Sequence, residues 1–132
     1  MNFKIGSDIC SVKRIEEAYD KFGERFLDKI LTAGEKSYVL SNKKDILSRT
    51  AVRFAAKEAM SKVLGTGFRG LAFKEIEVVK LPSGAPAIQL HGRAVEIAQK
   101  RKLDSFEITL SHEREYAIAF VLGFENRSHS GD

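Results

Sequence analysis

Residues 45–64 read DILSRTAVRFAAKEAMSKVL, and they form the longest stretch of the chain with the spacing of an α-helix. At about 100° per residue, the first half of the segment carries one apolar stripe, made of Leu47, Ala51, Phe54 and Ala55. The stripe continues with polar and small residues, namely Glu58, Ser61, Lys62 and Gly65. A second apolar line lies on another side and contains Val52, Ala56, Ala59 and Val63. Because a helix with two apolar sides is usually covered twice, we expect a sheet on one side and another subunit on the other.

Glu58 lies in the middle of the first stripe, where at least part of its side chain is expected to be buried. An unpaired buried carboxylate costs several kcal/mol, so Glu58 needs a partner. One interpretation is an ion pair with Lys62, which lies one helical turn further on. The other is a metal cation. The helix alone does not decide between them.

Asp8 offers a second carboxylate, in the N-terminal segment. Two sets of residues alternate there, which predicts a strand: Phe3, Ile5, Ser7 and Ile9 against Lys4, Gly6, Asp8 and Cys10. Gly6 has no side chain, and we interpret it as room for a ligand beside Asp8. Asp8 is either an acid at a strand end or, together with Glu58, a ligand of Mg²⁺, which proteins hold through one or two carboxylates, water and substrate phosphate.

The rest of the pattern predicts helices early and strands late. Thr32 and Glu35 form a capping box that starts a helix, and Gly65 ends the long one. The other expected helices are 11–19, 24–30 and 92–102, and the other expected strands are 76–79, 87–90, 106–110 and 116–122, with turn-rich links at 81–86 and 111–115. This order indicates an α+β fold in which an antiparallel sheet packs with a long central helix. We expect one domain over residues 1–124 and a flexible tail over 125–132.

Composition narrows the class of protein. The 132 residues are 43% hydrophobic and 30% charged, as in ordinary globular domains. Cys10 is the only cysteine, so no internal disulfide can form, and no apolar run reaches the roughly 18 residues of a membrane span. We therefore expect a cytoplasmic protein without a membrane partner. The net charge of +4 suits an acidic or phosphate-bearing partner. No Cys/His finger or aromatic RNA-binding motif occurs, so no nucleic-acid partner is expected.

Several of these segments together resemble the holo-acyl-carrier-protein synthase family of 4′-phosphopantetheinyl transferases. The resemblance covers roughly residues 3–122. Its motifs are Ile5-Gly6-Ser7-Asp8-Ile9 with Arg14-Ile15; Phe26, Ile30-Leu31-Thr32 and Glu35; Arg53-Phe54-Ala55-Ala56-Lys57-Glu58-Ala59 with Lys62 and Gly65-Thr66-Gly67; Gly84-Ala85-Pro86; and Ser111-His112 with Tyr116-Ala117. The Lys-Glu-Ala helix joined to an N-terminal Gly-x-Asp is the most specific part.

The resemblance implies a fold, a reaction and partners. The fold is the 4′-phosphopantetheinyl transferase fold, as a homotrimer with active sites at subunit interfaces. The reaction moves 4′-phosphopantetheine from coenzyme A to a serine of apo acyl carrier protein and releases adenosine 3′,5′-bisphosphate, in fatty acid biosynthesis. The implied cofactor is Mg²⁺.

The resemblance also implies roles for particular residues. Asp8 and Glu58 hold the metal, and both count as catalytic with Lys62, which contacts the diphosphate as the acid for the leaving group unless it only pairs with Glu58. The implied coenzyme A contacts are Arg53, Ser61, Lys62, Gly65, Thr66, Gly67, Gly84, Pro86 and His112. Arg53 suits the 3′-phosphate because a guanidinium forms a bidentate fork. His112 is a second candidate for the 3′-phosphate, with a structural role as the alternative, and Gly65 by itself is also explained as a helix cap.

Arg14, Lys21 and Arg25 are expected to share one basic surface, which either docks the acidic carrier protein or is an ordinary solvated face. A competing class is a non-enzymatic basic module that binds an acidic protein or RNA. That class does not account for Asp8 and Glu58 at positions where unpaired acids are costly.

Overall fold

The computed structural model describes residues 2–126 of the chain. Its helices are α1 (Val12–Phe22), α2 (Glu24–Ile30), α3 (Ala33–Leu40), α4 (Ile46–Leu64) and α5 (Arg93–Lys100), with short 3-10 turns at Lys43–Asp45 and Phe73–Glu75. Its strands are β1 (Phe3–Ser11), β2 (Ile76–Lys80), β3 (Pro86–Leu90), β4 (Ser105–His112) and β5 (Tyr116–Phe124). The sequence-based elements are all present. Two elements extend beyond their expected ends: α1 continues from Tyr19 to Phe22, and β4 continues through Ser111 and His112, which we expected in the link.

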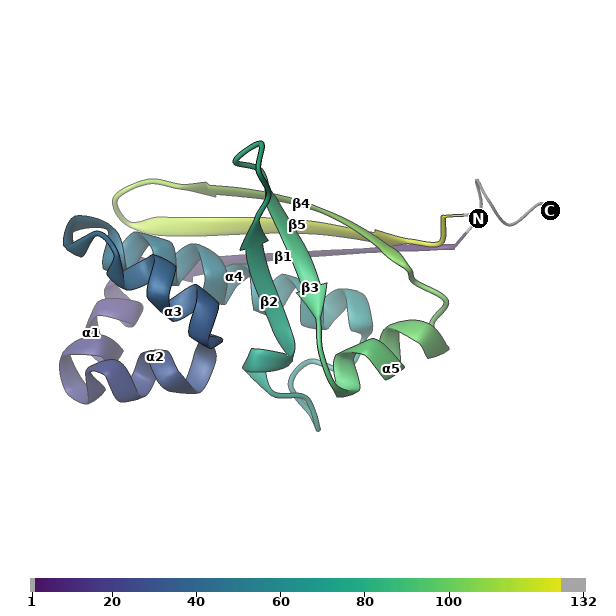
Figure 1. Cartoon of the computed structure of the whole chain (residues 1–132), viewed down its shortest axis with the longest axis horizontal. Helices are drawn as coiled ribbons and strands as arrows, with labels where there is room; N and C mark the ends of the chain where they lie inside the picture. The colour runs from purple at the N-terminus through teal and green to yellow at the C-terminus, as the bar shows by residue number, and fades with distance from the viewer. Residues whose placement is uncertain (1, 127–132) are drawn as a thin grey trace.

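The strands form two antiparallel sheets rather than one. The larger has the order β1-β5-β4, and the smaller is the β2–β3 hairpin. Figure 1 shows α4 running along the three-stranded sheet, with α1, α2 and α3 at one end and α5 at the other. The hairpin crosses α4 and reaches β4 through β3. The architecture is therefore α+β, with α4 at the centre.

Both apolar sides of α4 are covered by this chain itself. One side packs on β1 and β5, and the helix also contacts β2, α1, α3 and α5. Ala51, Ala55, Ala56, Ala59 and Val63 are all fully buried in one core cluster. The expectation that another subunit covers the second side of α4 is therefore wrong, because the hairpin and the small helices fold back onto it.

Gly6 has a packing role instead of the ligand-space role that the sequence suggested. A Cβ at this position would collide with the carbonyl oxygen of Ala59 and lie 3.2 Å from the Cβ of Lys62. The space that a side chain of residue 6 would occupy is therefore taken by the backbone of α4, which approaches β1 closely at this point. This close approach brings Asp8 beside the C-terminal half of the helix.

A buried ion pair joins α3, α4 and β2. Lys57 Nζ lies 2.7 Å from Glu35 Oε1, and both side chains are 0% exposed. The ammonium also donates to the Phe73 and Ile76 carbonyl oxygens, while Glu35 Oε2 accepts from the Val78 amide at 2.7 Å. Because all these groups have partners, the pair can stay charged in the core. Nothing in the sequence near Lys57 indicated this buried pair.

The outer face of the three-stranded sheet is apolar over β1 and β5 and uncovered in the single chain. Six large side chains on β1 and β5 are 44–61% exposed there, namely Phe3, Ile5, Ile9, Tyr116, Ile118 and Phe120. The apolar residues of β1 therefore face outward, and Gly6, Asp8 and Cys10 face α4.

Two further expectations concern the ends and the membrane. Among residues 2–126, no helix combines the length and the apolar character that crossing a bilayer requires. Of the expected tail, Glu125 and Asn126 are described, and their amides donate to Asn2 O and Asp104 Oδ1. The remainder of the tail lies outside the described residues.

Candidate active site

Asp8 and Glu58 come together where β1 crosses the second half of α4. Asp8 pairs in register with Ala119 of β5 and faces the helix. Lys62 Nζ lies 3.5 Å from Asp8 Oδ1 and donates to the Ser7 carbonyl oxygen at 2.7 Å. The ion pair of Lys62 is thus with Asp8 on the strand, and not with Glu58 on its own helix.

The Glu58 carboxylate faces Asp8 without a partner of its own. Within residues 2–126 it forms no ion pair or hydrogen bond. Partial burial raises the pKa of the Glu58 carboxyl, and the Asp8 carboxylate raises it further, whereas Lys62 and Arg14 act in the opposite direction. Burial and Asp8 likewise raise the pKa of the neighbouring Cys10 thiol to about 11, so this sulfur stays protonated. A cation bound between Asp8 and Glu58 would offset the repulsion between the two carboxylates.

These donors fit a magnesium ion. No group of three or more His, Cys, Asp or Glu side chains that could hold a metal occurs in the described part of the chain. Two half-buried carboxylates, one of them unpaired, are nevertheless what Mg²⁺ needs when water and substrate phosphate complete its six ligands. Asp8 and Glu58 are therefore the residues that would hold it.

The turn after α4 is fixed by the conformation of Gly65 and by local hydrogen bonds. Gly65 adopts a left-handed conformation with φ of 79°, and a Cβ there would collide with the guanidinium of Arg101. Ser61 is buried, and its hydroxyl donates to the Glu58 carbonyl oxygen, while the Thr66 hydroxyl donates to Gly67 O. This hydrogen bond holds the Ser61 hydroxyl against its own helix. Arg101 was missed because 36 residues separate it from Gly65.

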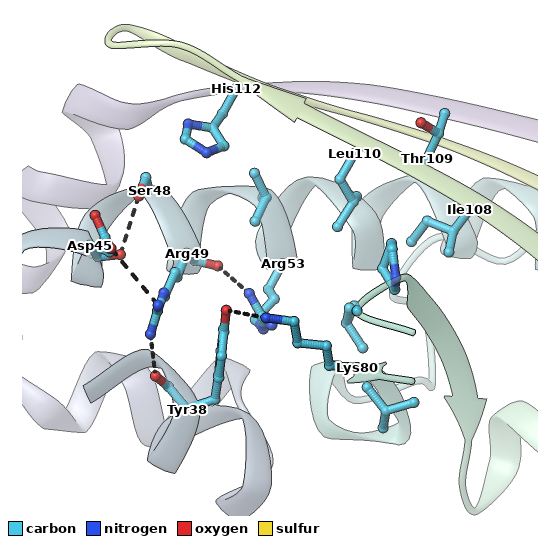
Figure 2. A pocket seen from close by; sticks show the side chains of 15 residues that line it. Tyr38, Asp45, Ser48, Arg49, Arg53, Lys80, Ile108, Thr109, Leu110 and His112 are labelled. Atoms are coloured by element: carbon cyan, nitrogen blue, oxygen red, sulfur yellow. Dashed lines mark hydrogen bonds and ion pairs between the residues drawn. The ribbon is translucent and has the colours of Figure 1, made fainter. Parts of the chain in front are cut away.

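A second group of the expected residues lines a cavity of about 440 Å³ beside the first half of α4 (Figure 2). Arg53, Gly84, Pro86 and His112 lie there. Tyr38, Arg49 and Lys80 also line the cavity and were not expected in a site. Arg49 precedes Arg53 by one helical turn, and this spacing was a usable signal. Arg53 is 7% exposed, and burial lowers the pKa of its guanidinium.

The two groups do not meet within one chain. None of Asp8, Glu58 and Lys62 lines the cavity formed by residues 2–126. Five residues of helix turn Arg53 about 140° away from Glu58 around the axis. The carboxylates lie at the β1 side of the sheet, and the cavity lies at the β4 side.

The expected docking residues lie on the two N-terminal helices. Arg14 and Lys21 on α1 and Arg25 on α2 are all exposed. Arg25 and Lys29 border an apolar hollow of about 530 Å³ that Phe22, Phe26, Ile30, Phe54 and Phe73 line. The surface therefore combines positive charge with apolar contact area.

Comparison with known proteins identifies the family and the fold of this chain. The model of the 4′-phosphopantetheinyl transferase superfamily matches residues 4–121. The chain belongs to this superfamily. Within the superfamily, a holo-[acyl-carrier-protein] synthase of Gloeobacter violaceus is 44% identical over 123 residues, which are 92% of this chain and 93% of the relative.

Solved structures of superfamily members agree with the fold. The holo-[acyl-carrier-protein] synthase of Helicobacter pylori, solved in complex with coenzyme A, has a TM-score of 0.80 at 35% identity and covers 92% of this chain and 100% of its own. The synthase of Neisseria meningitidis has a TM-score of 0.85 at 32% identity and covers 92% and 97%. The resemblance and the α+β transferase fold inferred from the sequence are confirmed.

Proposed function

We propose that this chain is a holo-[acyl-carrier-protein] synthase that transfers 4′-phosphopantetheine from coenzyme A to a serine of apo acyl carrier protein. The observation that carries the proposal is the pair of facing carboxylates, Asp8 and Glu58, beside Lys62 in a member of this superfamily. Residues 1–124 would form the transferase domain. The reaction would serve fatty acid biosynthesis in the cytoplasm.

The chemistry forms one phosphorus–oxygen bond and breaks another. The carrier serine oxygen attacks the pantetheine-side phosphorus of the diphosphate and gives up its proton to a base. Adenosine 3′,5′-bisphosphate leaves with the bridging oxygen. Mg²⁺ held by Asp8 and Glu58 would supply Lewis-acid stabilisation of the phosphate oxygens. Lys62, whose side chain is 54% exposed, would add positive charge at the leaving side.

We propose further that the working site lies between subunits of a homotrimer. The carboxylates and the basic cavity are on different sides of one protomer, so a neighbour must supply the second half of a site that uses both. Arg53, Gly84, Pro86 and His112 would then bind the adenosine 3′-phosphate end of coenzyme A from that neighbour. Gly65, Thr66 and Gly67 would lie near the diphosphate, on the carboxylate side.

Carrier docking is proposed for the surface of Arg14, Lys21 and Arg25. Acyl carrier proteins are small and acidic, and exposed arginine and lysine side chains steer an acidic partner. The neighbouring apolar hollow gives such a partner area to bury.

The proposed reaction is tested by incubating the protein with coenzyme A, Mg²⁺ and an apo carrier protein, and by weighing the carrier by mass spectrometry. We expect the carrier to gain one phosphopantetheine group, and the gain to disappear with EDTA. A competent carrier that gains nothing in fresh Mg²⁺ would contradict the transferase proposal and favour the non-enzymatic basic module. Transfer that persists with EDTA would contradict the metal proposal alone.

A further inference from the structure

Tyr38 lies at the centre of three cations in the cavity beside α4 (Figure 2). The guanidinium carbons of Arg49 and Arg53 are 4.1 and 4.7 Å from the centre of the Tyr38 ring, and Lys80 Nζ is 5.2 Å from it. These distances are within the range of cation–π attraction. Residues from α3, α4 and β2 thus converge on one aromatic ring.

The positive charge around the ring is poorly balanced by protein acids. Asp45 is the only acid among the described residues that line the cavity, and it lies 3.8 Å from Arg49. Glu35 also acts on Arg53, but its carboxylate is already held by Lys57. The Nε of Arg53 is buried, and within residues 2–126 it has no hydrogen-bond partner. Like charges one helical turn apart repel, so the arrangement leaves a place for an anion.

The three cations depend on the Tyr38 ring for their positions to different extents. Arg49 is also fixed by its hydrogen bonds to the Tyr38 carbonyl oxygen and the Ser41 hydroxyl, which do not need the ring. Arg53 donates to the Arg49 carbonyl oxygen. Among the described residues, Lys80 Nζ donates only to the Tyr38 hydroxyl, at 3.4 Å. Arg53 and Lys80 therefore depend more on the aromatic face than Arg49 does.

We propose that Tyr38 is a positioning residue whose ring holds Arg49, Arg53 and Lys80 as an anion clamp, and that this clamp makes the protein select coenzyme A over its form without the 3′-phosphate. The inference rests on the proposed transferase function and assigns the selectivity to the ring. A phosphate monoester dianion suits the clamp because several donors from three elements can surround it. Tyr38 itself need not touch the phosphate.

The test compares transfer from coenzyme A and from 3′-dephospho-coenzyme A by the full-length protein. Tyr38→Leu removes the ring, and Tyr38→Phe keeps the ring and removes the hydroxyl. We expect Tyr38→Leu to raise KM for coenzyme A roughly tenfold, equivalent to about 1.4 kcal/mol. KM for the dephospho form should change less than about threefold, with the loss on KM rather than kcat. Tyr38→Phe should retain most of the discrimination.

Two further variants keep the test decisive. Tyr38→Gln is a second ring deletion with good helix propensity, for use if Tyr38→Leu unfolds. Tyr19→Leu removes a half-buried ring from α1, outside the cavity, and should leave the ratio of the two KM values unchanged. The positioning role of the ring is overturned if the ring deletions keep the wild-type ratio of the two KM values. It is also overturned if Tyr38→Phe loses as much discrimination between the two donors as Tyr38→Leu does.

Direct binding separates this inference from the proposed reaction. Calorimetry should show that Tyr38→Leu weakens the binding of adenosine 3′,5′-bisphosphate roughly tenfold. It should change the affinity for adenosine 5′-monophosphate much less. If the wild-type protein transfers from neither donor, the transferase proposal fails, and this calorimetric difference alone supports the clamp. Equal effects on both nucleotides, or none, overturn it.

Discussion

At the scale of single residues, Glu58 is the side chain whose environment departs most from what an isolated helix would give it. Its carboxylate is half-buried and next to Asp8, and no side chain of residues 2–126 pairs with it. Burial raises its pKa most, and Asp8 raises it second. A carboxyl whose pKa is higher in the folded state favours folding when protonated. Above that pKa, the ionised group therefore lowers the stability of the metal-free protein.

Glu58→Gln tests this environment and the metal role together. We expect kcat to fall at least about a hundredfold, since the metal contributes several kcal/mol to the stabilisation of transition-state charge. The melting temperature without metal should stay equal or rise at neutral pH, because a neutral amide replaces a disfavoured charge. Transfer assays and thermal melts with and without Mg²⁺ give both readouts.

Glu96→Gln on the exposed surface of α5 is the matched control for that substitution. It should change neither the turnover nor the shift in melting temperature that Mg²⁺ produces. A Glu58→Gln protein that turns over normally at low Mg²⁺ would show that Glu58 is not a ligand.

Some contacts of single residues could be predicted from the sequence, and others could not. The cost of unpaired acids predicted that Asp8 and Glu58 need a shared explanation, and they do lie near each other. The partner of Lys62 was not predictable from helix spacing, which favours Glu58, because the competing strand is 55 residues away. The burial of Lys57 was hidden for a similar reason, since the local capping box already explained Glu35.

At the scale of elements, local signals fix where helices and strands lie, and distant contacts fix which face is covered. The 3.6-residue period and Gly65 predicted α4 to within one residue of its observed start. Alternation alone could not predict which face of β1 packs on the core, because the apolar residues of β1 face outward in this chain. Pairing with β5 and the close approach of α4 at Gly6 set that orientation.

Gly6→Ala is the sharpest test of this contact between elements. The added methyl group meets the Ala59 backbone, which cannot move aside as a side chain can. We expect a loss of about 1–3 kcal/mol in the free energy of unfolding. Transfer activity should fall by more than the unfolded fraction explains, because α4 moves Glu58 away from Asp8. Urea unfolding and assays at saturating Mg²⁺ measure the two effects.

Gly34→Ala in α3 is the control for that substitution. Its Cβ would lie 3.2 Å from Glu77 Oε2, a side-chain oxygen held by Thr32 and not part of the backbone, and alanine is the better helix former. The control should therefore keep its activity and its stability. If Gly6→Ala behaves like Gly34→Ala, the close approach of α4 to β1 does not hold the two carboxylates in place.

At the scale of the whole molecule, the outer face of the β1-β5-β4 sheet is the feature that a single chain leaves unexplained. Six large apolar side chains lie exposed on two adjacent strands, Phe3, Ile5, Ile9, Tyr116, Ile118 and Phe120. Contiguous apolar surface of this kind marks an interaction site. Further copies of the chain covering it would also allow the carboxylates of one protomer to face the basic cavity of another.

Mixed assemblies of two variants test that arrangement, at a coenzyme A concentration too low for either variant alone to turn over. Glu58→Gln damages the carboxylate half of the site, and Arg53→Ala damages the cavity half. If each site spans two subunits of a trimer, co-expression in equal amounts should restore about a quarter of the wild-type activity, because about a quarter of random interfaces join two intact halves. Co-expression of Glu58→Gln with Asp8→Asn should restore nothing, since both changes damage the same half. Sedimentation should give trimers for every mixture. Mixed trimers of Glu58→Gln and Arg53→Ala that stay inactive would contradict a site shared between subunits, and so would a fully active monomer.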